Sequence, residues 1–209
     1  ACPERESHAR WAERWWRLKR ETDQLSRQIQ NRTGAVAKIF DRVTDVLTQL
    51  EYIEPGKNGE MTLNAHGRIL RRIYGERDLL VAESLRQGFW NDLDAASLAA
   101  MATTLVYEPR RDEGDLGDRY LPRGPFREAF DKTTTLWAQL DDLERDNRLP
   151  GSQPLAAGLA LSMYRWANGS NLDSVLDLAE MAAGDFVRVT KQTSVVESSP
   201  TALSLRLDS

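Results

Sequence analysis

A chain of 209 residues, 41% of them hydrophobic, is long enough for one large domain or two small ones with a substantial core. The net charge of −4 excludes a uniformly basic nucleic-acid binder, but 28 lysines and arginines leave room for a local basic groove. The single cysteine, Cys2, excludes an intrachain disulfide framework, and with two histidines no zinc motif is readable. The cysteine usage fits a reducing cytosol, so a cytoplasmic location is expected. No run of eighteen apolar residues and no signal-peptide pattern is present, so no membrane association is expected.

Residues 4–31 are predicted to form one long helix, because Pro3 suits a first helical turn and an apolar seam follows at steps of four and three. The seam residues are Trp11, Trp15, Leu18, Thr22, Leu25 and Ile29. Charged side chains occupy the other faces, so the pattern indicates a coiled-coil-like helix that needs an antiparallel partner. No such partner is evident in the chain, and packing of this helix on its own domain stays an open alternative.

Thr33 and Gly34 are expected to end the first helix, and a second amphipathic helix is predicted over residues 35–51. Residues 52–63 read as a short β-hairpin around a Pro-Gly-containing turn. A third helix is expected to begin near Asn64. A helix, a two-stranded wing and a helix together resemble the end of a winged-helix unit.

The remaining chain is predicted to consist of helices separated by Gly, Pro and capping residues. Asp78 and Asp94 are the expected caps of the first two of these helices, and Pro109 ends the second. The expected helices cover residues 78–85, 94–108, 126–147, 155–166, 172–181 and 185–192, with one long loop over 109–125. The predicted fold class is all-α: a multi-helix bundle preceded by a long coiled-coil-like helix and a winged-helix remainder with a small β-hairpin.

Motifs for independent catalysis are missing from the sequence. There is no phosphate-binding loop, and Gly56 and Lys57 lie in a hairpin turn too short to form one. His8 falls on a charged helix and His66 in the first turn of another, so neither suggests catalysis or a metal site. Most carboxylates alternate with Arg and Lys along helices, as solvated faces do. No catalytic residue, metal ligand or cofactor is therefore predicted within this chain.

Three stretches in a fixed order resemble one protein family: residues 62–85, residues 93–108 and the segment from Trp166 to Gln192. They resemble the C-terminal DSHCT region of the superkiller and exosome-cofactor helicases of superfamily 2, in particular those of the actinobacterial HelY type. The resemblance extends over about residues 4–192 and rests on the order and spacing of the stretches rather than on any single motif.

This resemblance implies the domain organisation and the partners. Residues 1–32 would be the returning stalk helix of a coiled-coil arch, 33–63 the winged-helix remainder, 64–192 the DSHCT helical bundle and 193–209 an irregular tail. ATP and Mg²⁺ would bind to RecA-like domains elsewhere in the parent helicase, and the bundle would contact those domains and a single strand of RNA or DNA. The apolar seam of this stalk helix would also allow two copies of the chain to dimerise. Residues Thr193 to Pro200 depart from the family pattern, which normally continues a helix there.

The most specific candidate site is the last helix of the bundle. Arg188 and Lys191 lie three residues apart and are expected to project from one face, close to a helix start at Gly184 and Asp185 that favours phosphate. The carboxylate of Asp185 would oppose an anion there, so a capped helix with an ordinary solvated face remains the alternative reading.

A second candidate is the helix over residues 94–108, which resembles the helix that lies along the translocated strand in this family. Its expected exposed positions are Ser97, Thr103, Thr104 and Glu108, with Arg110 and Arg111 just beyond. Trp90 and Trp137 are weighed as base-stacking residues, although tryptophans at helical spacing more often belong to a core.

Two functions from different classes stay open at this point. One is a strand-guiding region of an ATP-dependent helicase, with Arg188, Lys191, Glu108, Arg110, Arg111 and Thr104 as the nucleic-acid-binding residues. The other is a protein-interaction scaffold that makes no nucleic-acid contact. A basic strip on the surface favours the first, and an exposed apolar seam on the long helix favours the second.

Overall fold

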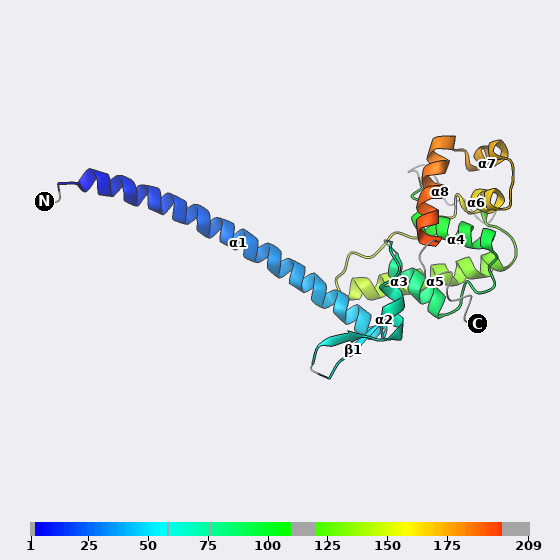
Figure 1. Ribbon diagram of the computed structural model, residues 1–209, viewed down its shortest axis with the longest axis horizontal. Helices are drawn as coiled ribbons and strands as arrows, with labels where there is room; N and C mark the ends of the chain where they lie inside the picture. Colours follow the sequence, from blue (N-terminus) through cyan, green and yellow to red (C-terminus); the bar gives the residue numbers. More distant parts are fainter. Residues whose placement is uncertain (1–2, 58, 76, 110–119, 198–209) are drawn as a thin grey trace. The chain divides into compact units, whose positions relative to one another are not determined.

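The computed structural model describes residues 3–57, 59–75, 77–109 and 120–197, which are mostly helical with a single two-stranded sheet. The elements are α1 (Arg5–Gln49), β1 (Ile53–Pro55), β2 (Met61–Leu63), α2 (Ala65–Leu70), α3 (Asp78–Arg86), α4 (Ala95–Val106), α5 (Pro125–Asp146), α6 (Ala160–Ala167), α7 (Leu172–Ala179) and α8 (Ala183–Glu197) (Figure 1). The predicted class, a mainly helical bundle with a small hairpin, is confirmed. The chain divides into two compact units, residues 1–45 and 46–209.

α1 is one helix of 45 residues, so the predicted break at Thr33 and Gly34 is wrong. The steps of four and three that begin at Trp11 continue beyond Ile29 through position 32 to Val36, Ile39 and Val43. Because the register is unbroken, nothing in the pattern separates two helices. One glycine costs a helix interior about 1 kcal/mol, which is too little to end a helix with many hydrogen bonds on both sides. The predicted domain boundaries themselves stay a prediction.

The seam of α1 is exposed to solvent within its own unit. Trp11 and Ile29, near the two ends of the predicted seam, are 65% and 64% exposed. Val36, Ile39 and Phe40 farther along are exposed as well. Within the first unit, therefore, no other described residue covers this apolar seam.

The hairpin and α2 are held together by a close approach at Gly67. β1 and β2 pair antiparallel, with Ile53 opposite Leu63, as the sequence predicted. Asn64 caps α2 by accepting a hydrogen bond from the Gly67 amide at 3.0 Å. A Cβ atom at Gly67 would overlap the Tyr52 carbonyl oxygen. Only glycine allows α2 to pack this tightly against the end of β1.

A buried carboxylate joins this region to α3. Glu83 is 1% exposed, and its Oε2 accepts hydrogen bonds from Arg86 at 2.9 Å and from Gln87 at 3.2 Å. Burial raises the pKa of Tyr52, and the neighbouring Glu83 raises it further. Both Tyr52 and Leu80 belong to the main core, so the start of the second unit is anchored to the bundle.

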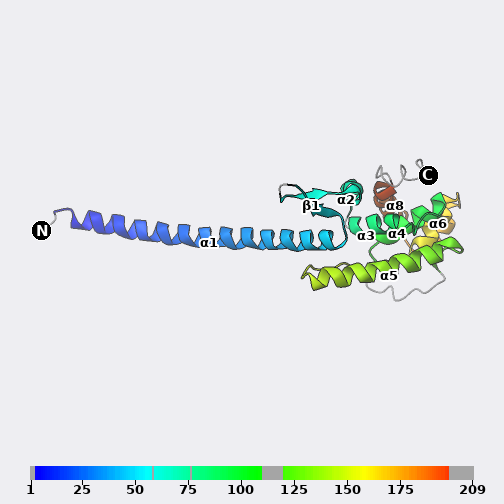
Figure 2. The same ribbon diagram turned by 90° about the horizontal axis from the view of Figure 1, so that it is seen from below.

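The core of the second unit forms around α4. α4 packs against α6 and α8, and α5 lies alongside α3 and α4 (Figure 2). The Asp94 side chain caps α4 by accepting from the Ser97 amide at 2.7 Å, as predicted. The Trp90 indole donates to Thr133 Oγ1 at 2.9 Å, which connects the segment before α4 to α5.

Two helix boundaries differ from the sequence prediction because of tertiary contacts. α6 begins at Ala160 rather than near residue 155; the segment before it has no regular secondary structure and is joined to α4 by a hydrogen bond from the Ala156 amide to the Thr104 carbonyl oxygen at 3.2 Å. α8 continues to Glu197 instead of ending near Gln192. Thr193 is 2% exposed, and its hydroxyl donates to the Val189 carbonyl at 3.0 Å and lies 3.2 Å from the Thr103 hydroxyl. Burial of Thr193 thus extends the helix into the segment predicted as an irregular tail.

Gly34 in α1 and Gly67 in α2 give a matched pair of stability predictions. Gly34→Ala should stabilise the helix of the first unit by about 1 kcal/mol, because Gly34 has open space around it and alanine is the better helix former. Gly67→Ala should instead destabilise the second unit by roughly 1–3 kcal/mol, because the new methyl group overlaps backbone. Circular dichroism during thermal unfolding measures both. Equal effects of the two changes would contradict the continuous α1 or the close approach at Gly67.

Thr193 tests whether the end of α8 belongs to the core. Thr193→Ala should lower the free energy of unfolding by about 1–2 kcal/mol, because a buried hydrogen-bonding side chain is lost. Ser194→Ala, one residue along on the exposed side, should change it by less than about 0.5 kcal/mol. Chemical denaturation of both variants makes the comparison. If Thr193→Ala does not lower the free energy of unfolding, the segment of α8 from residue 193 onward does not pack on the core.

Candidate functional site

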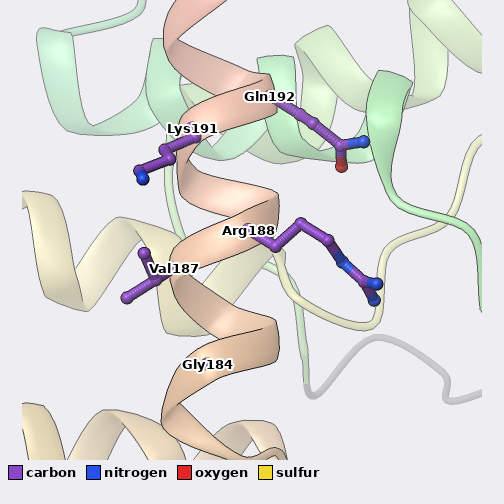
Figure 3. Close-up of a pocket in the computed structure, with 5 residues that line it drawn as sticks. All are labelled: Gly184, Val187, Arg188, Lys191 and Gln192. Atoms are coloured by element: carbon purple, nitrogen blue, oxygen red, sulfur yellow. The ribbon is translucent and has the colours of Figure 1, made fainter.

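The exposed face of α8 is the clearest candidate site. Its residues recur at i, i+3, i+4, i+7 and i+8, which places them on one side of a helix. They are Gly184, Val187, Arg188, Lys191 and Gln192, and they line a shallow hollow of about 480 Å³ (Figure 3). The opposite side of α8 is buried through Phe186, Val189 and Thr193. The core contacts therefore fix the helix while its basic face stays in solvent.

Arg188 and Lys191 share this face, as the spacing predicted, but their charges differ in availability. Arg188 forms an ion pair with Asp185, with Nη2 and Oδ1 3.3 Å apart, although its side chain remains 71% exposed. No ion pair of Lys191 is recorded among the residues that the structure describes. In Figure 3 the Lys191 and Arg188 side chains leave opposite edges of the face. Among the described residues, the positive charge of Lys191 is therefore unpaired, whereas that of Arg188 is partly balanced by Asp185.

The start of α8 is less suited to an anion than the sequence suggested. The helix begins at Ala183, and the Ala182 carbonyl accepts the Phe186 amide at 3.1 Å. Asp185 therefore lies inside the first turn rather than before it, where its carboxylate opposes a bound phosphate. The candidate chemistry of α8 rests on its two basic side chains and not on its N-terminus.

The predicted exposed face of α4 is wrong. Ser97 is buried, and Thr103 and Thr104 are 0% exposed. The Thr103 hydroxyl donates to the Ala99 carbonyl at 2.8 Å and the Thr104 hydroxyl to the Met101 carbonyl at 2.7 Å. Alanines and a methionine surround these hydroxyls on every side of α4, and a helix that is apolar all round belongs in a core. A strand on the surface therefore cannot reach the Thr104 side chain, and the predicted contact is wrong.

The other residues predicted near α4 have different outcomes. Glu108 is exposed, but it lies beyond the helix, which ends at Val106. Arg110 and Arg111 lie outside the described residues. Trp90 is buried, so the core reading of this tryptophan is correct and base stacking by it is excluded. Trp137 is half-buried, packs against the main core and donates its indole N–H to Ser152 Oγ at 2.9 Å.

Sequence reasoning overlooked two apolar side chains near the α8 face. Val187 belongs to the exposed stripe and is 48% exposed. Trp166 is exposed at the end of α6, and its ring meets the buried Phe186 ring edge-on with centroids 6.2 Å apart. The i+3 spacing from Gly184 to Val187 is a signal in the sequence, whereas the Trp166 contact depends on how α6 and α8 meet.

A second hollow, of about 50 Å³, lies between α3 and α5 and is lined in part by Arg77, Asp78, Trp137 and Glu144. Burial raises the pKa of Asp78, and burial together with Asp141 and Asp78 raises that of Glu144. Arg77 already donates to the Pro154 carbonyl at 3.2 Å, which indicates a structural role.

The described residues contain no cluster of three potential metal ligands, and none of their helices is long and apolar enough to cross a membrane.

The second unit is a bundle of helices with an exposed basic helix face, and comparison with known proteins assigns the chain to a family. Residues 60–196 match the model of the DSHCT (NUC185) domain, and the chain belongs to this family. It is 36% identical over 200 residues to proteins named "Probable helicase HelY" from Mycobacterium tuberculosis, strains CDC 1551 / Oshkosh and ATCC 25618 / H37Rv, and from Mycobacterium leprae strain TN. These matches cover 91% of this chain and 22% of each relative, so the chain spans about a fifth of their length.

Proposed function

We propose that this chain is an accessory region of an ATP-dependent helicase and guides a translocated single strand beside the motor. The DSHCT match and the similarity to proteins named as probable helicases support the parent class. ATP and Mg²⁺ belong, in this proposal, to RecA-like domains of the parent protein, and no residue of this chain is assigned to them. Those domains and the single strand are the proposed partners.

The observation that carries the strand-guiding role is the exposed basic face of α8. Lys191 offers an ammonium group with no recorded ion pair among the described residues, and Arg188 lies one turn before it. Exposed ion pairs are worth only about 0–1 kcal/mol, so Arg188 can exchange Asp185 for a strand phosphate at little cost. Contacts to phosphate hold a strand without reading its bases. Weak contacts of this kind suit a surface that must release each nucleotide as the motor advances.

The first prediction from this proposal concerns salt dependence. The 209-residue chain should bind a fluorescent single-stranded oligonucleotide weakly, and affinity should fall as salt rises because bound phosphates release counterions. Arg188→Ala combined with Lys191→Ala should flatten the log–log salt slope by about 1.4, since each single-strand contact contributes about 0.7. Anisotropy titrations at several salt concentrations measure this slope. Parallel titrations with RNA and DNA of one sequence compare the two substrates.

Two further variants test whether the effect comes from the α8 charges themselves. Asp185→Asn should strengthen binding, because it removes the carboxylate that pairs with Arg188 and repels phosphate. Arg17→Ala combined with Arg20→Ala removes the same total charge from exposed positions of α1 and should leave the slope unchanged. If the α8 variant and the α1 variant give the same slope, the basic face of α8 does not contact the strand.

A protein-interaction scaffold is the second candidate, and the exposed seam of α1 favours it. Leucine, isoleucine and tryptophan side chains along that seam remain in solvent within the first unit. Complete burial of one such side chain stabilises an association by roughly 1.5–3 kcal/mol. The seam would pair with another helix, either from the parent protein or from a second copy of this chain.

We expect the isolated chain to self-associate through this seam. Sedimentation equilibrium should show dimers at high protein concentration, and Leu18→Glu combined with Leu25→Glu should shift the population to monomers by placing charges in the buried interface. Trp16→Glu is the control, because Trp16 is exposed but lies outside the steps of four and three. A wild-type chain that stays monomeric at every concentration would contradict pairing between copies.

A further inference from the structure

A second basic surface lies on α2 and the turn that follows it. Arg68, Arg71 and Arg72 stand at i, i+3 and i+4, so their side chains leave one face of the segment. Helical hydrogen bonding continues past the end of α2, because the amides of Arg71 and Arg72 donate to the carbonyls of Gly67 and Ile69. All three arginines are exposed. The opposite face packs on the main core through Ile69, Leu70 and Ile73.

Two of the three arginines on this face have no recorded side-chain partner among the described residues. Arg68 donates to the Leu63 carbonyl at 3.2 Å, which holds it against the hairpin. For Arg71 and Arg72, no side-chain hydrogen bond or ion pair is recorded within the described ranges. The hairpin carries exposed carboxylates at Glu54 and Glu60, but neither forms an ion pair with these arginines. As far as the described residues go, the guanidinium groups of Arg71 and Arg72 are therefore open to an external anion.

An exposed aromatic ring follows the arginines directly. Tyr74 is 72% exposed and belongs to none of the core clusters, whereas its neighbour Ile73 is 7% exposed. The buried Ile73 fixes the backbone at this point, so the Tyr74 ring is presented from a firm support. Because Tyr74 makes no core contact and follows two exposed arginines, its ring is available to a ligand rather than needed for folding.

We propose that Arg71, Arg72 and Tyr74 form a second single-strand contact, in which the guanidinium groups bind backbone phosphates and the ring stacks on a base. The inference rests on the proposed function and extends it to a surface separate from α8, since α2 packs on α3 and β2 whereas α8 packs on α4. Guanidinium groups suit phosphate because of their planar, forked donors. An acidic peptide would engage Tyr74 only if it carried an aromatic residue at the matching position, whereas every nucleotide of a strand supplies both a phosphate and a flat base.

The test uses the 209-residue chain and a fluorescent single-stranded oligonucleotide. Arg71→Ala combined with Arg72→Ala should flatten the salt slope by about 1.4, the value for two lost phosphate contacts. Tyr74→Ala should weaken binding by about tenfold with the slope unchanged, while Tyr74→Phe keeps the stacking surface and should bind like the wild type. Arg17→Ala combined with Arg20→Ala is the charge-matched control. Thermal unfolding should be unaffected in every variant, because the altered side chains are exposed.

The outcomes separate this inference from the proposed function. If the α8 variant flattens the slope and the α2 variants do not, the second contact is wrong and the strand-guiding function stands. The reverse result would keep the α2 contact and remove α8 from the site. Loss of binding in Tyr74→Phe as well as Tyr74→Ala would overturn the stacking role. A wild-type chain that binds no single strand would overturn both proposals.

Discussion

Burial of α4 on all its sides is the constraint on which the second unit depends. Nearly all residues of this helix, from Ala96 to Leu105, are buried, so neighbouring segments must cover every side of it. α6 and α8 supply most of that cover. Its two threonines satisfy their hydroxyls on α4's own carbonyls, which lets them enter the core without an unpaired polar group. The hydroxyl pair of Thr103 and Thr193 then extends α8 past its predicted end.

The division of α8 into two faces follows from that constraint. Phe186, Val189 and Thr193 must face α4 and the cores around it, so residues offset by one or two positions, including Arg188 and Lys191, must face solvent. The orientation of both basic side chains is thus set by burial elsewhere on the helix. The helix backbone that carries these side chains loses little conformational freedom when it meets a ligand, although ordering each long side chain costs about 0.5–1.5 kcal/mol. Exchange of the exposed Arg188–Asp185 ion pair for another anion costs at most about 1 kcal/mol. The proposed strand contact is weak and yet well positioned for these reasons.

The sequence predicted features that depend on local physics and missed those that depend on tertiary contacts. Asp94 caps α4 as expected, a helix begins beside Asn64, and the hairpin has the expected strands, because capping and turn chemistry act within a few residues. Asp78, the other expected cap, is instead the first residue of α3, and the preceding position, Arg77, makes no side-chain capping hydrogen bond. The burial of Thr104 was not predicted, because threonine is a polar residue type. Only the alanines and the methionine on all sides of the same helix indicate that it lies in the core. The continuity of α1 was readable, because the steps of four and three pass Gly34 without a shift. The start of α6 was not readable, since the segment before it packs against α4, with a hydrogen bond from Ala156 to Thr104, fifty-two positions away in the sequence.

The two candidate functions use different kinds of surface and therefore respond differently to the solvent. Arg188 and Lys191 on α8 act through charge, whose effect on exposed groups falls as salt shortens the screening length to about 8 Å at physiological ionic strength. The seam of α1 acts through apolar burial, which salt does not screen and some salts strengthen. A strand contact and a helix–helix contact can consequently coexist in one chain without competing for the same residues. Raising the salt concentration separates them, because it dissociates the first while it preserves the second.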